Sequence, residues 1–208
     1  MKKQKMLFGI IAMFVCLLLL ISGCTQQKTP TTTSIQGILA KAKNIGPARY
    51  LAVTTYFVNG TLTMNETKSI IEKSPYMKVK MSDGISSLIM IKRPDGVYVY
   101  NSESNNYTKI DTSFSEPSLE ELSNAFLLNI SFRVVGNETI NGNATTIIQY
   151  TTNESGILGT AQIWIWNEKG IPIKSQITVL MGKTTLTTKT EYVNFVFGDI
   201  PLSEFSVS

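Results

Sequence analysis

Apolar and polar residues alternate one by one over much of the chain beyond residue 45. In the segment 76–82 every second residue is apolar from Met77 onward, and lysines lie between them. This period of two is typical of a β-strand with one buried face. Asn-Gly and Asp-Gly pairs suited to hairpin turns interrupt such runs, as at Asn59-Gly60 and Asp95-Gly96. The pattern predicts an antiparallel meander with strands at about 48–58, 61–73, 76–82, 86–93, 97–101, 106–111, 129–137, 143–153, 160–167, 171–181 and 184–197.

Some of these segments are apolar on both faces. Segment 88–91 is one, and segment 163–166 places two indoles on one side and two isoleucines on the other. Strands with two apolar faces need cover on both sides, which favours helices packed on the concave face of a curved sheet. Segment 128–134 also alternates, so we expect Leu128 and Phe132 to share one face of a strand.

Helical spacing is found in two places. Between residues 35 and 45 apolar residues recur three and four positions apart, starting at Ile35. Ser118 and Glu121 have the spacing of a capping box, and an apolar stripe of Leu119, Leu122 and Phe126 follows. The sequence therefore predicts an α+β fold with an N-terminal helix and a second helix inserted after the middle strands.

The first 24 residues have the features of a targeting signal. Three lysines precede a long uncharged and almost wholly apolar run, 6–22. The tetrapeptide Ile21-Ser22-Gly23-Cys24 resembles the lipobox of prokaryotic lipoproteins. This resemblance implies cleavage before Cys24 and lipidation of that cysteine. The alternative is an uncleaved anchor, because about 20 apolar residues are enough to span a bilayer.

Both alternatives tether the chain to a membrane and place the rest of it on the extracytoplasmic side. We expect a signal peptide at 1–23, the lipidated Cys24 with a flexible Thr-rich tether to residue 34, and one domain at 35–208. The only other cysteine is Cys16, inside the signal. The domain is therefore expected to fold without disulfides, for which its length is sufficient.

Charge and residue types argue against several classes of function. The net charge of +4 becomes +1 without the three lysines of the signal, which leaves no basic footprint for nucleic acid. The chain contains no histidine, so His-based acid-base catalysis and His-ligated metals are excluded. No phosphate-binding loop or nucleophile-elbow motif is found either. We expect no catalytic residues, no cofactor and no metal.

Asn-x-Ser/Thr sequons are frequent after the signal. They occur at Asn59, Asn65, Asn106, Asn129, Asn137, Asn143 and Asn153. One interpretation is an N-glycosylated surface protein, which together with a prokaryotic lipobox points to an archaeal cell surface. The other is that a Thr-rich β-protein forms sequons by accident.

The order of elements resembles the LolA/LolB lipoprotein-carrier superfamily. An N-terminal helix, a long meander, one inserted helix and more meander follow each other in that order. Local segments agree: Asp95-Gly96-Val97-Tyr98-Val99-Tyr100-Asn101, the turn at 135–142, the hairpin 164–174 and the closing strand 192–207. The resemblance implies an incomplete β-barrel of about 10 or 11 strands with helices on its concave face. In the family an arginine of an early strand holds the helical lid, but the residues around Arg49 do not match that pattern.

In this family the concave face holds acyl chains or other hydrophobic ligands. Methionine and aromatic side chains adapt well to variable apolar ligands. The candidate lining residues are Met77, Val79, Met81, Met90, Phe132, Trp164, Trp166, Leu119, Leu122 and Phe126. Ordinary core packing explains the same residues equally well.

Two functions are therefore open at the level of sequence. The first is a membrane-anchored lipoprotein that binds a lipid or the acyl chains of another lipoprotein, in lipid or lipoprotein sorting or transport. The alternative is a structural or sensing surface module without a ligand cavity, acting through protein or glycan contacts. An apolar cavity with bound lipid favours the first, and a fully packed half-barrel with an exposed patch favours the second.

Overall fold

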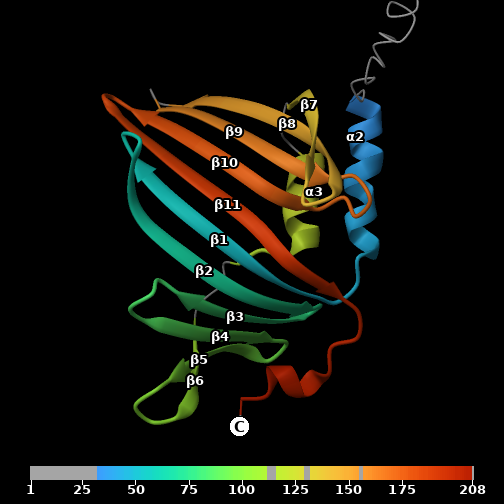
Figure 1. Cartoon of the computed structure of the whole chain (residues 1–208). Helices are drawn as coiled ribbons and strands as arrows, with labels where there is room; N and C mark the ends of the chain where they lie inside the picture. Colours follow the sequence, from blue (N-terminus) through green and yellow to red (C-terminus); the bar gives the residue numbers. More distant parts are fainter. Residues whose placement is uncertain (1–31, 112–115, 129–131, 155–156, 208) are drawn as a thin grey trace, which may run out of the picture.

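The computed structural model describes residues 32–111, 116–128, 132–154 and 157–207. Eleven strands form one curved antiparallel sheet in the order β6-β5-β4-β3-β2-β1-β11-β10-β9-β8-β7 (Figure 1). Because β6 and β7 are not paired with each other, the barrel is incomplete. This confirms the predicted fold class.

Hairpins connect most of the strands, as the turn signals predict. Asn59 and Asn141 have φ of 50° and 51°, the left-handed conformation that these hairpin turns require. The strand bounds are β1 (Ala48–Val58), β2 (Thr61–Lys73), β3 (Tyr76–Ser82), β4 (Ser87–Arg93), β5 (Gly96–Asn101), β6 (Asn106–Ile110), β7 (Arg133–Ile140), β8 (Asn143–Glu154), β9 (Ile157–Trp166), β10 (Pro172–Met181) and β11 (Thr184–Phe197).

The two α-helices lie on one side of the sheet (Figure 1). The N-terminal helix α2 (Thr32–Leu39) continues into a 3-10 helix, η1 (Ala40–Asn44), so the expected helix 35–45 begins earlier and tightens in its second half. The inserted helix α3 spans Leu119–Leu128. Its capping box forms as predicted, since the Glu121 N–H donates to Ser118 Oγ at 3.1 Å and the Ser118 N–H donates to Glu121 Oε2 at 2.7 Å.

One predicted strand boundary is wrong. Leu128 was expected to begin a strand, but it is the last residue of α3, and β7 begins at Arg133. The reason is that alternation over a short segment does not by itself distinguish a strand from the end of a helix. Residues 129–131 lie outside the described part of the chain.

The inner, concave face of the sheet carries most of the core. One cluster of buried residues joins Tyr50 and Ile70 of the sheet to Ala42 of η1 and Leu119 of α3. A second joins Ile148, Ile163 and Ile165 to Ile35 and Leu39 of α2. The predicted cover of the concave face by helices is therefore present.

A third cluster lies on the outer face. Ile91 is fully buried although its neighbour Met90 points to the inner face, because Ile200 and Phe205 cover it. Phe205 belongs to a short 3-10 helix, η2 (Leu202–Phe205), close to the end of the chain. The sequence analysis did not anticipate this turn.

Within the described residues, no helix has both the length and the hydrophobicity needed to cross a membrane.

Candidate functional site

The inner face near α3 holds the centre of the predicted ligand-lining set. Met77 and Val79 are buried in one cluster with Leu119 of α3, and Met81 packs against it. Met90 lies directly opposite Val79 in the neighbouring strand and therefore shares its face. These side chains from β3, β4 and α3 are brought together as the sequence pattern indicates, and they fill the space between sheet and helix.

Phe126 and Phe132 lie apart from this group. Both pack against the second cluster, formed by α2 with β8 and β9. Leu122 is half-buried on α3. The helices thus divide the candidate residues between two regions of the inner face.

Trp164 points to the outer face. Ile163 and Ile165 on either side of it are buried under α2, so the alternation of the strand turns the indole away from the helices. Its Nε1–H donates to Glu138 Oε2 at 2.6 Å, and Lys174 Nζ lies 4.5 Å from the ring centroid. Trp166, at the end of β9, lies against Phe195 and Phe197, each with 6.1 Å between ring centroids.

The inner face continues beyond the helices as an uncovered apolar area. Four large apolar side chains near the strand ends are 40–44% exposed and share the inner face by register and alternation: Met64, Leu88, Ile177 and Met181. We call them the open strip. In Figure 1 the ends of β1, β2 and β9–β11 extend well away from α2 and α3. The open strip is a set of separate apolar side chains on the uncovered part of the inner face, with Thr188 between Ile177 and Tyr56 and with Lys68 beside Met81.

A buried carboxylate ties the N-terminus of α3 to the sheet. Glu72 of β2 is 6% exposed, and its Oε2 accepts hydrogen bonds from the Tyr50 hydroxyl at 3.2 Å and from the Leu119 N–H at 3.3 Å. Burial raises the pKa of Glu72 to about 7, although both hydrogen bonds act in the opposite direction. The carboxylate partner at a helix N-terminus is electrostatically favourable when it is charged.

A second polar contact acts on the segment just before α3. Lys68 of β2 donates to Glu116 Oε2 at 2.7 Å, and the Lys68 ammonium lies 3.5 Å from Glu66 Oε1. Lys68 and Glu72 share the inner face with Ile70 between them. This polar row was not predicted from the sequence, although a charged residue on either side of Ile70 at a spacing of two was a visible signal.

A cleft of about 610 Å³ lies at this end of α3. Its walls come from η1, the β2–β3 turn and the first turn of α3, and Glu72 and Met77 lie among its lining residues. The cleft adjoins the polar contacts that hold α3. Movement of α3 away from β2 would join it to the core beneath the helix.

Comparisons with known proteins match the fold but no sequence family. No family model and no curated protein matches the chain. MucB in complex with MucA(peri) superimposes with a TM-score of 0.50 at 14% identity, over 86% of this chain and 60% of MucB. The lipoprotein LppX of Mycobacterium tuberculosis gives 0.46 at 16% identity, over 78% and 96%. A LolA superfamily protein from Nitrosomonas europaea gives 0.41 at 11% identity, over 83% and 97%.

The chain has a LolA/LolB-like fold. It spans about three fifths of the length of MucB. In this LolA/LolB-like half-barrel Arg49 does not hold a helix of the inner face. Its guanidinium instead donates to Glu204 Oε1 of η2 at 2.8 Å on the outer side.

The sequons are scattered over the half-barrel. Asn59 lies in the β1–β2 turn, Asn65 and Asn106 are exposed on strands, and Asn137 and Asn143 are half-buried. Asn153 lies near the end of β8, whereas Asn129 and Cys24 lie outside the described residues. In the part of the chain that the structure describes, no group of acidic, His and Cys side chains is arranged to hold a metal ion.

Proposed function

We propose that this chain is a membrane-anchored, extracytoplasmic lipoprotein whose half-barrel binds a hydrophobic ligand. The ligand is a lipid or the acyl chains of another lipoprotein, and the role is in lipid or lipoprotein sorting or transport. The anchor is the acylated Cys24, and the proposed domain is 35–208. The LolA/LolB-like fold supports this assignment, but the proposal depends on one feature of the inner face.

That feature is the open strip. Met64, Leu88, Ile177 and Met181 expose apolar surface on the concave side of the sheet, next to a buried apolar core. Exposed apolar side chains gathered on one concave face are typical of a ligand or interaction site. A concave apolar surface fits an acyl chain better than a folded partner, because it can surround a narrow flexible chain.

The ligand gains room when α3 moves. The helix fills the inner face with Leu119. Among the described residues, its polar contacts with the sheet are at its N-terminal end, through Glu72 and through Glu116 with Lys68. Breaking these contacts would free Leu119 and expose Met77 and Val79 to an entering chain. Helices that close over a site in this way are known to gate ligand access.

Native mass spectrometry with lipid extraction tests the proposal on residues 26–208 incubated with host membrane lipids. Ile177→Asp places a charge in the open strip and should lower the lipid-bound fraction at least about tenfold, because an ionised carboxylate is costly beside an acyl chain. Leu180→Asp is the matched control, since both residues lie on β10 and are 40% exposed but point to opposite faces. It should bind lipid like the unchanged protein.

If every sample shows only the mass of the protein without lipid, and the protein unfolds cooperatively, the proposal is contradicted. The half-barrel would then be a scaffold without a lipid ligand. Equal lipid binding by Ile177→Asp and the unchanged protein would place the lipid elsewhere. Loss of lipid in both aspartate variants would mean that binding depends on general surface hydrophobicity, not on the inner face.

The sequons support a further part of the proposal. Glycans at the exposed Asn65 and Asn106 would lie outside the core and leave the fold undisturbed. We include N-glycosylation and an archaeal cell surface in the proposal, to be tested by glycopeptide analysis of the protein from its own host. Unoccupied sequons in that material would contradict the proposed glycosylation and leave the lipid-binding proposal unaffected.

A further inference from the structure

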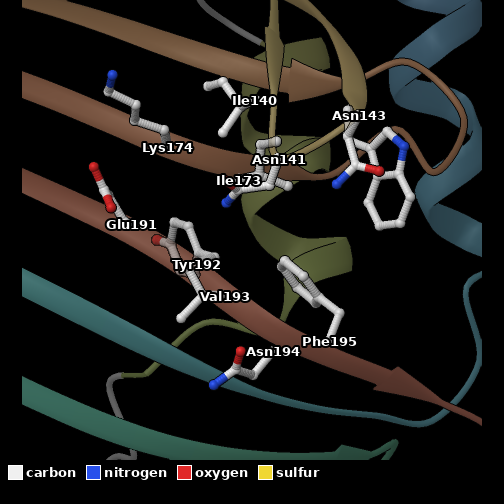
Figure 2. Close-up of a pocket in the computed structure, with 11 residues that line it drawn as sticks. Ile140, Asn141, Asn143, Ile173, Lys174, Glu191, Tyr192, Val193, Asn194 and Phe195 are labelled. Atoms are coloured by element: carbon white, nitrogen blue, oxygen red, sulfur yellow. The ribbon is translucent and has the colours of Figure 1, made fainter.

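A second hollow, of about 360 Å³, opens on the outer face of the sheet (Figure 2). Lys174, Glu191 and Val193 line it, and their register places them on the face opposite to Tyr50 and Ala52, which contact the helices. The β7–β8 turn at Asn141 forms another wall. We call this hollow the outer cleft. Its charged residues point away from the inner face, whereas Tyr192 and Phe195 of its lining also pack against the inner core cluster.

Irregularities in two neighbouring strands create the outer cleft. The register of β10 against β9 shifts between Pro172 and Lys174, and the register of β11 against β1 shifts opposite Tyr50. Asn194 adopts φ of 58° at this point although it lies inside a strand, where no turn requires a left-handed conformation. Bulges of this kind redirect side chains and are frequent beside binding sites. The two shifts lie side by side beneath one hollow.

The outer cleft combines aromatic surface with unused amides. Trp166 and Phe195 are half-buried and pack in part against the inner core cluster, where the Phe195 ring lies 5.4 Å from that of Tyr50. The parts of the two rings that face the hollow are its aromatic surface. Asn141, Asn143 and Asn194 line the hollow, and their side-chain amides form no hydrogen bond with the residues that the structure describes. In Figure 2 the Asn194 amide extends over β1, on the other side of β11 from Asn141 and Asn143. Each amide can both donate and accept, as a hydroxyl group does. A ligand with many hydroxyls and an apolar ring face matches this lining.

The charges select among such ligands. Glu191 lines the outer cleft and forms no ion pair in the described part of the chain, so it would repel an acidic ligand. Lys174 lies on the neighbouring strand β10, opposite Glu191. Its ammonium lies over the Trp164 ring. The outer cleft therefore offers hydrogen bonds without a net positive charge, which disfavours phosphates and sugar acids.

We propose that the outer cleft binds a neutral pyranose sugar. The apolar face of the sugar would lie on Trp166 and Phe195, and its hydroxyls would exchange hydrogen bonds with Asn141, Asn143 and Asn194. The sugar belongs to a glycan, carried either by another surface molecule or by this chain. In the second case the sequon residue Asn143 at the rim would carry the glycan, and Asn141 and Asn194 would bind its hydroxyls.

Ligand-observed NMR with methyl glycosides tests the proposal on the full-length chain in lipid nanodiscs. The probes are the neutral methyl glucoside, galactoside, mannoside and N-acetylglucosaminide, with methyl glucuronide as the acidic comparison. At least one neutral probe should receive saturation transfer and change the tryptophan fluorescence, and the glucuronide should bind about tenfold more weakly. Asn194→Gly should weaken binding about fivefold, since glycine keeps the left-handed backbone and removes only the amide.

Asn105→Gly is the matched control, because Asn105 has φ of 50° but lies in the β5–β6 turn, outside the lining of the outer cleft. It should bind sugar like the unchanged protein. Absence of transfer to every neutral probe overturns the proposal, as does sugar binding that Asn194→Gly leaves unchanged. Glucuronide binding as tight as that of the neutral probes also overturns it.

Two expression hosts distinguish the source of the sugar. If the glycan of this chain fills the outer cleft, protein from an N-glycosylating host will not bind free glycoside, whereas protein from a host without N-glycosylation will. If both preparations bind, the sugar comes from another molecule. A lipid-binding failure of the inner face would leave these results unchanged, because the two faces are tested with different ligands.

Discussion

At the scale of single residues, Glu72 links the stability of this protein to pH. Its pKa rises from 4.5 to about 7 in the folded chain, because burial disfavours the charged form. Tyr50 shares this burial, and Glu120 and Glu121 of α3 add negative charge nearby. The folded chain therefore holds a proton on Glu72 between about pH 4.5 and pH 7, where the unfolded chain has lost it. Folding stability from this group falls as pH rises through that window.

Glu72→Gln should remove this pH dependence. The amide oxygen can still accept from Leu119 and Tyr50, so the variant should match the unchanged protein near pH 5. At pH 8 it should be more stable by about 3 kcal/mol, which corresponds to the difference between the two pKa values. Urea unfolding at both pH values measures the effect. Glu120→Gln, at the same helix end but less buried, serves as control, and an equal gain in both variants at pH 8 would contradict the assignment to Glu72.

Gly170 is a residue at which the fold accepts no side chain. A Cβ there would collide with the carbonyl oxygen of Ile38, and its φ of 75° already disfavours other residues. Gly170→Ala should destabilise the chain by more than about 3 kcal/mol, because the β9–β10 turn would separate from α2. Gly182→Ala has a similar φ of 59° with open space around it and should cost only about 1 kcal/mol. Equal losses in chemical unfolding would mean that the backbone conformation, not the contact with α2, decides the cost.

At the scale of elements, η2 is held by packing more than by charge. Phe205 is 2% exposed, and its ring centroid lies 5.5 Å from that of Tyr76. Phe205→Ala should therefore cost about 3 kcal/mol in thermal or urea unfolding. Arg49→Ala removes the ion pair with Glu204, but both side chains are about one third exposed, so the loss should stay below about 1 kcal/mol. The reverse order would show that the ion pair, not the ring, fixes the end of the chain.

The strands and helices follow from local rules, which is why the sequence predicts most of them. Alternation at Met77 and the capping box at Ser118 act over a few residues and are independent of the rest of the chain. The bulge at Asn194 and the contact of Phe205 with Ile91 depend on residues far away in sequence. No pattern within a short window contains that information, and this also explains the misplaced strand start at Leu128.

At the scale of the whole molecule, the curvature of the sheet decides what the candidate residues can do. Sequence spacing places Met77 and Val79 on one face of β3. The antiparallel pairing of β3 with β4 then brings Met90 beside Val79. The same alternation separates Trp164 from the helices, which composition alone could not indicate. Glu72 accepts a hydrogen bond from the backbone of Leu119 in α3, a residue 47 positions away along the chain. The sequence pattern therefore predicts which residues of one strand share a face, but it does not predict which residues of other strands and helices lie beside them.

The proposed attachment of the whole half-barrel to a membrane leads to the last prediction. If Cys24 is acylated, intact-mass analysis of the membrane fraction should find a chain that begins at Cys24 and carries the added mass of acyl chains. Cys24→Ser removes the thiol that the lipid requires, so the variant should retain residues 1–23 and carry no lipid. Two acyl chains are needed for stable attachment, because one alone binds only marginally. A retained anchor gives another result, since both proteins would then keep residues 1–23 and neither would carry lipid.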